Sequence, residues 1–259
     1  MTVTLPLEFD ATASASTWAV LLFASFVPPV LFVLWVRNTE LHQREPLAAI
    51  GRAFLWGAVV SVIAAVILSL ALLLVVEQIG PLYEVLGRRF SDPQAIVLLI
   101  VVAPLAEELA KGFGMFGARR HIREQEDGLV YGAAVGFGFS ATENVLYGGV
   151  ALLQGGLAVS IATIAVRSIS ASLLHASSSG VFGYGIARHL LMPGRPSWVP
   201  YYFAAVAMHA TFNFLAGFAY VYAPLGAAGG LIGFATAVVF ALIAISAVRG
   251  KIRTLDRAA

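Results

Sequence analysis

Two adjacent glutamates and a lysine lie within an otherwise apolar stretch, Pro104 to Gly114, PLAEELAKGFG. The residues before it, AIVLLIVVA, and those that follow, FGMFGA, have the composition of a membrane span. On a helix, Glu107 and Glu108 are four and three residues from Lys111, so either can pair with it. A charged side chain at the centre of a bilayer costs roughly 2.5–3.5 kcal/mol on insertion scales. We therefore expect one glutamate to be neutralised by Lys111 and the other to be free for chemistry.

The next three apolar stretches carry ionisable or amide side chains in short polar sequences. Glu143 and Asn144 lie in FSATEN, His175 lies in HASSSG, and His209 lies four residues before Asn213 in HATFN. Residues four apart project from one face of a helix. Counted along helices from the expected outer membrane surface, the depths run from roughly 9 Å at Glu143 to roughly 18 Å for the paired glutamates, with both histidines between. Four spans are thus expected to contribute to one layer of polar groups.

This inventory of carboxylates, imidazoles and an amide suits the activation of water. A carboxylate can take a proton from water, and histidine or asparagine can donate to the oxyanion that forms on a scissile carbonyl. The alternative is a zinc site built from Glu143, His175, His209 and one of the paired glutamates, with Glu107 as that ligand. No HExxH sequence supports the zinc version, and we favour water activation without a metal. The chain has no cysteine, which excludes thiol nucleophiles and disulfides.

Composition indicates an all-α, polytopic membrane helix bundle. The chain has 259 residues, of which 59% are hydrophobic and 12% are charged, about half the charged fraction of a soluble domain. The apolar stretches long enough to cross a bilayer predict about seven transmembrane helices. Their expected ranges are 17–36, 53–76, 95–117, 128–149, 160–187, 199–220 and 226–248. We treat residues 1–259 as a single integral membrane domain with its catalytic helices at roughly 95–220.

The distribution of basic residues predicts the orientation. Short cytoplasmic loops are enriched in Lys and Arg, and one set of alternating loops contains nearly all of these residues outside the spans. Its members are Arg37, Arg44, Arg52, Arg119, Arg120, Arg123, Arg188, Arg195, Arg249, Lys251, Arg253 and Arg257. The opposite set contains only Arg88 and Arg89, in a segment expected to be a loop or an interfacial helix. The N-terminus is therefore predicted outside and the C-terminus in the cytoplasm. The first 16 residues contain no Lys or Arg, so no cleavable signal peptide is expected.

Three further features favour structural interpretations. Pro28 and Pro29 should bend the first helix, because proline removes a backbone donor. Arg167 is expected to extend its side chain to the outer interface. The serines at 177–179 and the glycines of GAAVGFGF are typical of close helix packing.

The four polar sequences together resemble a known family. EELAK fits EExxK, FSATEN fits FxxxEN, HASSSG contains a lone histidine, and HATFN fits HxxxN. In this order on successive helices, they resemble the PrsW family of intramembrane proteases, distant relatives of CAAX prenyl endopeptidases and bacteriocin-processing enzymes. The resemblance covers roughly residues 100–215.

The resemblance implies hydrolysis of a peptide bond in a membrane protein. Founding members of the family cut a single-pass anti-sigma factor on its extracytoplasmic side. By motif, Glu107 and Glu108 supply the base and its partner, and His175, His209 and Asn213 supply the other catalytic groups. Glu143 stands where the CAAX relatives have histidine, so its role as a metal ligand, a second carboxylate or an orienting group stays open. Lys111 and Asn144 are expected to support these residues.

The partners expected from the resemblance are a single-pass membrane protein or peptide and the lipid bilayer, with no nucleic acid. The location expected is the cell membrane, as a multi-pass protein. The rival function is a proton- or cation-coupled transporter that uses the buried Glu and His residues. A transporter predicts inverted repeats and broken helices in both halves. Here the polar residues are concentrated in the third to sixth stretches, which favours the protease.

Overall fold

The computed structural model describes residues 14–90, 92–218 and 226–258, and every regular element within them is helical. The predicted all-α class is confirmed for these residues. In chain order the elements are α1 (Ala15–Arg37), α2 (Leu47–Leu55), the π-helical η1 (Trp56–Ser61), α3 (Val62–Val76), α4 (Gly80–Gly87), α5 (Pro93–Val97), the π-helical η2 (Leu98–Val102), α6 (Ala103–Ala118), the 3₁₀ turn η3 (Arg119–His121), α7 (Gln125–Ile169), α8 (Ala171–Leu191), α9 (Val199–Ala216) and α11 (Gly226–Asp256). The first 13 residues lie outside the described residues, and with them most of the N-terminal segment for which no cleavable signal peptide was expected. The end of the sixth predicted stretch also lies outside them.

The helical runs follow the predicted stretches, with differences at their boundaries. The elements α2, η1 and α3 form one run, and α5, η2 and α6 form another. α1 continues through Pro28 and Pro29, and the bend there stays a prediction. Within the described residues, four stretches are long and apolar enough to cross a membrane: Ala15–Arg37, Leu47–Val76, Gln125–Leu191 and Gly226–Asp256. α6 and α9 are not among these four, so the count of seven crossings stays a prediction.

α7 is two helices joined by a reversal at Gly156. This residue has a φ of 77° inside the element, a conformation that glycine adopts without steric cost. The chain then runs back along itself, since the Ser160 hydroxyl donates to the carbonyl of Gly148 at 2.7 Å. The predicted fifth helix, 160–187, is interrupted at Ser170, where α7 ends and α8 begins. The reversal places residues after Gly156 beside those that precede it.

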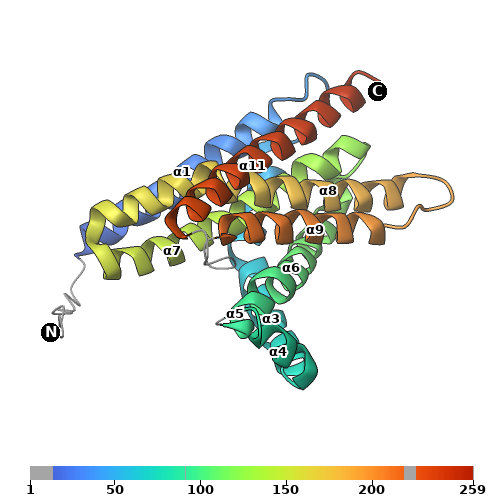
Figure 1. Cartoon of the computed structure of the whole chain (residues 1–259). Helices are drawn as coiled ribbons and strands as arrows, with labels where there is room; N and C mark the ends of the chain where they lie inside the picture. Colours follow the sequence, from blue (N-terminus) through green and yellow to red (C-terminus); the bar gives the residue numbers. More distant parts are fainter. Residues whose placement is uncertain (1–13, 91, 219–225, 259) are drawn as a thin grey trace, which may run out of the picture.

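The helices form a bundle from which one hairpin projects. α7 packs against α1 and α8, and α8 also packs against α9 and α11. Figure 1 shows α3, α4 and α5 extending away from these helices, and α3 packs against α6. α6 connects this projecting hairpin to the bundle. The start of α1 and the end of α11 lie at opposite ends of the bundle (Figure 1).

Small residues allow the helices that carry the polar side chains to approach closely. A Cβ added at Gly132 would lie 2.2 Å from the carbonyl oxygen of Ser179, and one at Gly136 would lie 2.3 Å from that of His175. Both distances are far below a van der Waals contact, so α7 and α8 touch backbone to backbone here. The predicted packing role of these glycines is confirmed.

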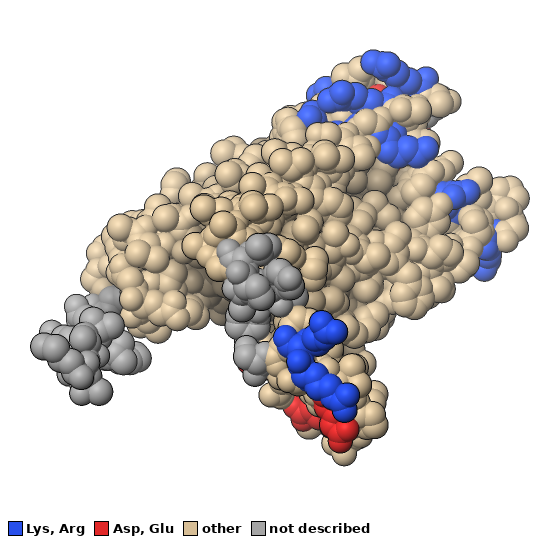
Figure 2. Space-filling model, in the orientation of Figure 1, with Lys and Arg blue, Asp and Glu red and all other residues tan. Residues whose placement is uncertain are grey.

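Basic side chains gather at one end of the bundle, which we call the C-terminal pole because α11 ends there. Figure 2 shows Lys and Arg at this pole, with a second basic group on the projecting hairpin, and none on the visible face between them. Arg37, Arg188 and Arg253 each lie in the last turn of their helix. This distribution agrees with the predicted orientation, which itself stays a prediction.

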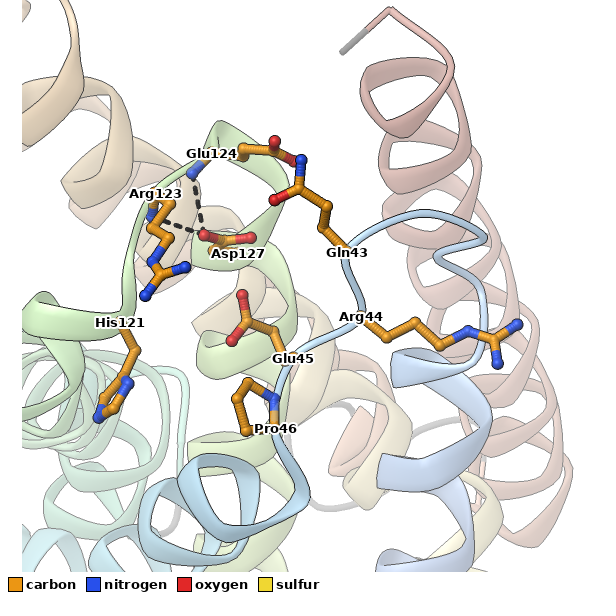
Figure 3. A pocket seen from close by; sticks show the side chains of 8 residues that line it. All are labelled: Gln43, Arg44, Glu45, Pro46, His121, Arg123, Glu124 and Asp127. Atoms are coloured by element: carbon orange, nitrogen blue, oxygen red, sulfur yellow. Dashed lines mark hydrogen bonds between the residues drawn. The ribbon is translucent and has the colours of Figure 1, made fainter.

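A cluster of buried carboxylates at the C-terminal pole joins the α1–α2 connection to the start of α7. Glu40 and Glu45, from that connection, are 2% and 5% exposed. A cavity of about 310 Å³ adjoins Glu45 and Asp127 (Figure 3). Burial raises the pKa of Glu40 and of Glu45 to about 8, and the charge of Asp127 adds to both shifts. The hydroxyl of Tyr131 donates to Glu45. Glu40 also faces two further carboxylates, Glu126 and Asp256.

The stability of this cluster should depend on pH. The ordinary pKa of these carboxyls is 4.5, so between about pH 5 and pH 8 the folded chain holds protons that the unfolded chain has released. The free energy of unfolding should therefore fall as pH rises through this window. Denaturation in detergent micelles should show a smaller fall for the double variant Glu40→Gln, Glu45→Gln than for wild type. The exposed Glu84→Gln is the control, and an unchanged slope in the double variant would contradict the assignment.

Candidate active site

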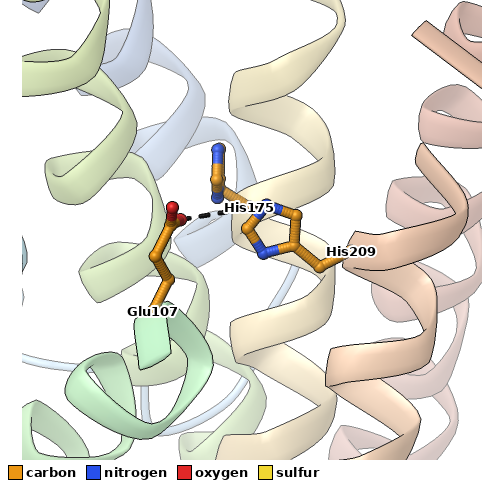
Figure 4. Close-up of side chains that lie close together, drawn as sticks. All are labelled: Glu107, His175 and His209. Carbon is orange, nitrogen blue, oxygen red and sulfur yellow. Dashed lines mark ion pairs between the residues drawn. The ribbon is translucent and has the colours of Figure 1, made fainter. Parts of the chain in front are cut away.

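The polar residues of four helices meet inside the bundle. Glu107, Glu108 and Lys111 come from α6, Glu143 from the first half of α7, His175 from α8 and His209 from α9. The rings of His175 and His209 lie edge to face with centroids 4.7 Å apart. Figure 4 shows Glu107 and both histidines pointing toward one another from their helices. The shared layer expected from the sequence is thus present as a single cluster.

Glu108 is fully buried and its carboxylate is saturated with donors. Its Oε1 accepts from Lys111 Nζ at 2.9 Å, from His209 Nδ1 at 2.9 Å and from Ser178 Oγ at 3.0 Å. Its Oε2 accepts from Ser179 Oγ at 3.3 Å. The ammonium of Lys111 compensates its charge. Such a carboxylate orients its neighbours, and it has little capacity left to accept a proton from a reactant.

Glu107 has the opposite environment. Its Oε2 has no hydrogen-bond partner. The nearest nitrogen atoms are Lys111 Nζ at 3.6 Å and His209 Nε2 at 3.8 Å, both beyond ordinary hydrogen-bond distance. Its side chain is 13% exposed, whereas that of Glu108 is 0% exposed. Of the two adjacent glutamates, Glu107 is the one available to a reacting molecule.

The two histidines are held in defined tautomers by charged neighbours. A carboxylate only accepts hydrogen bonds, so His209 Nδ1 donates to Glu108. Its Nε2 faces Glu107 Oε2 at 3.8 Å (Figure 4) and carries a lone pair in the neutral imidazole. His175 Nδ1 accepts from Lys111 Nζ at 2.8 Å, and its Nε2 donates to Glu143 Oε2 at 2.9 Å. His209 thus presents a free nitrogen toward Glu107, while both nitrogens of His175 are engaged.

An apolar groove leads to these residues from the side of the bundle. Its volume is about 430 Å³, and it lies between α3, the α5–η2–α6 run and α7. Val66 and Leu98 belong to its apolar walls, and Tyr147 lies on α7. Glu107 and Glu143 also line it and are its charged members among the described residues. A peptide segment in this groove would lie against the side chain of Glu107.

The amide side chains lie to either side of the cluster. Asn213 Nδ2 donates to the carbonyl of Leu99 in η2 at 2.9 Å, so its amide holds a π-helical turn that lines the groove. Asn144 donates to Ser168 and Ser172 at 3.4 and 3.3 Å. A catalytic role for Asn213 stays a prediction, and the contact with Leu99 favours a positioning role.

Two features of the site were not predicted from the sequence. The serines at 178 and 179 were assigned to packing, yet both donate to Glu108. The expectation that Arg167 extends to the outer interface is wrong. Its guanidinium instead binds Glu143 at 3.0 Å and Asn144 at 3.0 Å. The reversal at Gly156 brings Arg167 back to residues 23 and 24 positions earlier.

The cluster offers oxygen and nitrogen atoms of the kinds that bind zinc, but its surroundings oppose a dication. Among the described residues, Glu107, His175 and His209 offer ligand atoms within 4.8 Å of one another (Figure 4). Glu143, the further zinc ligand expected from the sequence, is not in this group. The oxygen and nitrogen donors suit zinc, but His175 has no free nitrogen, and the ammonium of Lys111 lies 2.8 Å from its Nδ1. A dication would be repelled there, so this arrangement does not fit zinc unless Lys111 moves away.

Comparison with known proteins supports a relationship over most of the chain. Residues 45–246 match the family described as PrsW family intramembrane metalloprotease. Protease PrsW of Clostridioides difficile (strain 630) is 29% identical over 203 residues, which is 75% of this chain and 78% of that protein. No solved structure matches. The matched range contains every residue of the cluster.

Proposed function

Because the chain belongs to the PrsW family of intramembrane proteases, we propose that it hydrolyses a peptide bond of a single-pass membrane protein by Glu107-activated water. The observation that carries this proposal is the buried, unpartnered Oε2 of Glu107, a residue that lines the apolar groove; this oxygen faces His209 Nε2 at 3.8 Å. A water molecule that bridges these two atoms would have its protons directed toward them and a lone pair toward the groove.

The reaction then needs one proton acceptor that later becomes a donor. Glu107 takes a proton from the water as the water oxygen bonds to the scissile carbonyl carbon. The resulting oxyanion lies near the positive charge of Lys111, 3.6 Å from Glu107 Oε2. Collapse of the tetrahedral intermediate breaks the C–N bond, and Glu107 returns its proton to the leaving nitrogen. Glu108 keeps Lys111 and His209 in place throughout.

The environment of His175 favours a mechanism without a metal, although the family is described as metalloprotease. We therefore expect cleavage to persist after treatment with a chelator. Loss of cleavage that zinc restores would instead make Glu107, His175 and His209 metal ligands. The transporter hypothesis is not favoured, because the family is proteolytic.

The proposed substrate enters the groove from the lipid as an apolar, uncharged segment. The groove walls are apolar, and a charged side chain there would be desolvated without a partner. An anti-sigma factor cut on its extracytoplasmic side is the substrate proposed from the family resemblance. The proposed location is the cell membrane, with several crossings.

Blocking the groove should weaken substrate binding. Val66 is exposed and lines the groove, while its neighbour Ile67 is also exposed but is not a lining residue. Val66→Trp should raise the KM for cleavage about tenfold, which corresponds to about 1.4 kcal/mol of lost binding. Ile67→Trp adds the same bulk to α3 outside the groove and should leave KM near the wild-type value. Equal KM values in the two variants would show that substrate does not use this groove.

The proposed function is tested by cleavage in proteoliposomes. The purified chain and a single-pass substrate with an apolar segment are reconstituted together, and products are identified by mass spectrometry with and without chelator. We expect a cut within or at the edge of the apolar segment in both conditions. No cleavage of a panel of such substrates, including an anti-sigma factor, would contradict the proposal.

A further inference from the structure

Arg167 connects the two halves of the α7 hairpin through three contacts with one surface. Its Nη2 donates to Glu143 Oε2 at 3.0 Å and its Nε donates to Asn144 Oδ1 at 3.0 Å. Its guanidinium also lies 3.7 Å from the ring centroid of Tyr147. All three partners precede the reversal at Gly156, whereas Arg167 follows it. The planar guanidinium with two directed hydrogen bonds and a stacked face has little freedom to move.

The same carboxylate oxygen of Glu143 binds both Arg167 and His175. Glu143 Oε2 accepts from Arg167 Nη2 at 3.0 Å and from His175 Nε2 at 2.9 Å. The other nitrogen of His175 accepts from Lys111 Nζ at 2.8 Å. A continuous path of polar contacts therefore runs from Arg167 through Glu143 and His175 to Lys111, the cation nearest Glu107 at 3.6 Å.

Charge compensation explains why this path needs Arg167. Glu143 and Glu107 both line the same apolar groove, where two uncompensated carboxylates would repel each other. Lys111 is already shared by Glu108 and His175. Among the described residues, Arg167 is the one guanidinium or ammonium group in a salt bridge with Glu143. Without it, Glu143 would lose its compensating charge and one of its two directed contacts.

We propose that Arg167 is a positioning residue of this site. It acts through Glu143 on His175, and thereby on the placement of Lys111. The proposal rests on the proposed proteolytic function. Arg167 does not itself touch the reacting atoms. Its stacking on Tyr147, a lining residue, also fixes that wall of the groove.

The test is a double-variant cycle between Arg167 and Glu143. Removal of a group that orients a metal ligand typically costs about 10–100-fold in activity. By analogy, Arg167→Gln, which removes the group that orients Glu143, should lower kcat for cleavage about 10–100-fold with little change in KM. Arg167→Lys keeps the charge but loses the fork of donors, and its kcat should be intermediate. In a Glu143→Gln background, Arg167→Gln should cost less than threefold further, because its partner is already absent. Independent effects that multiply, or an unchanged kcat in Arg167→Gln, would overturn the proposal.

Two controls distinguish a failure of the Arg167 proposal from a failure of the proposed proteolytic function. Arg249 lies 3.7 Å from the Trp35 ring and donates to Thr39 at the C-terminal pole, so Arg249→Gln removes a similarly stacked arginine far from the site. It should cut at the wild-type rate, and absence of cleavage in wild type and Arg249→Gln alike would count against the proposed function.

The same double-variant cycle can also be measured by unfolding in detergent micelles, which requires no cleavage assay. The Arg167→Gln, Glu143→Gln variant should then unfold no earlier than the less stable single variant, and additive losses would show that the two residues are not coupled.

Discussion

Glu107→Gln should abolish nearly all cleavage while leaving the fold intact. The amide cannot accept the proton of an attacking water, and loss of a general base typically costs about 10²–10⁴-fold. Because the substituted group has the same shape and its Oε2 has no hydrogen-bond partner to lose, KM and the unfolding temperature should stay near the wild-type values. The measurement is kcat and KM for a single-pass substrate in proteoliposomes, with thermal unfolding of the same preparation.

The control for Glu107→Gln is Glu84→Gln, which makes the same change on the exposed face of α4. It should cut as wild type does. If Glu107→Gln retained more than a tenth of the wild-type kcat, another group would have to be the base. The proposed division of labour between the two adjacent glutamates would then be wrong.

Glu108→Gln should destabilise the fold, in contrast to the change one residue earlier. Glu108 is fully buried and accepts from Lys111, His209 and two serines. Removing one partner of a buried ion pair leaves the other charge uncompensated and costs about 3–5 kcal/mol. Reversible unfolding in detergent micelles should show a loss of this size, together with loss of cleavage.

The matched control for this prediction is Ser179→Ala, which removes one neutral donor to Glu108. A hydrogen bond to a charged group is worth about 1.5–3 kcal/mol, so the loss should be smaller than that for Glu108→Gln. If Glu107→Gln and Glu108→Gln had equal effects on unfolding, the contrast between a free and a saturated carboxylate would not hold in solution.

The helices and the convergence of their polar residues could be predicted because both depend on local patterns. Apolar runs indicated the helical stretches, and the spacing of EELAK placed either glutamate within reach of Lys111. The depths of the polar residues, counted along the expected helices, then implied one shared layer. The roles of Glu107 and Glu108 could not be separated in this way, since adjacent helical residues differ in direction by about 100°. Which of them faces α8 and α9 depends on how α6 is rotated.

Other features depend on tertiary structure that no short pattern encodes. The π-helical η2 directly precedes α6 and alters the rotation of the residues after it by inserting wider turns. The contact of Arg167 with Glu143 depends on the reversal at Gly156. The separate predicted stretches 128–149 and 160–187 already implied a reversal between them, and the pair of glycines at 155 and 156 lies there. What no short pattern showed is that the Arg167 side chain points toward Glu143 and not toward the interface.

The most direct test of the proposed function measures cleavage and proton movement in the same vesicles. The chain is reconstituted with a single-pass substrate and a pH-sensitive dye inside the liposomes, under an imposed pH gradient. We predict that wild type produces two defined fragments, that Glu107→Gln produces none, and that neither dissipates the gradient faster than empty liposomes do. Dissipation that requires Glu107, with the substrate left intact, would show that the buried cluster carries protons and does not hydrolyse peptide bonds.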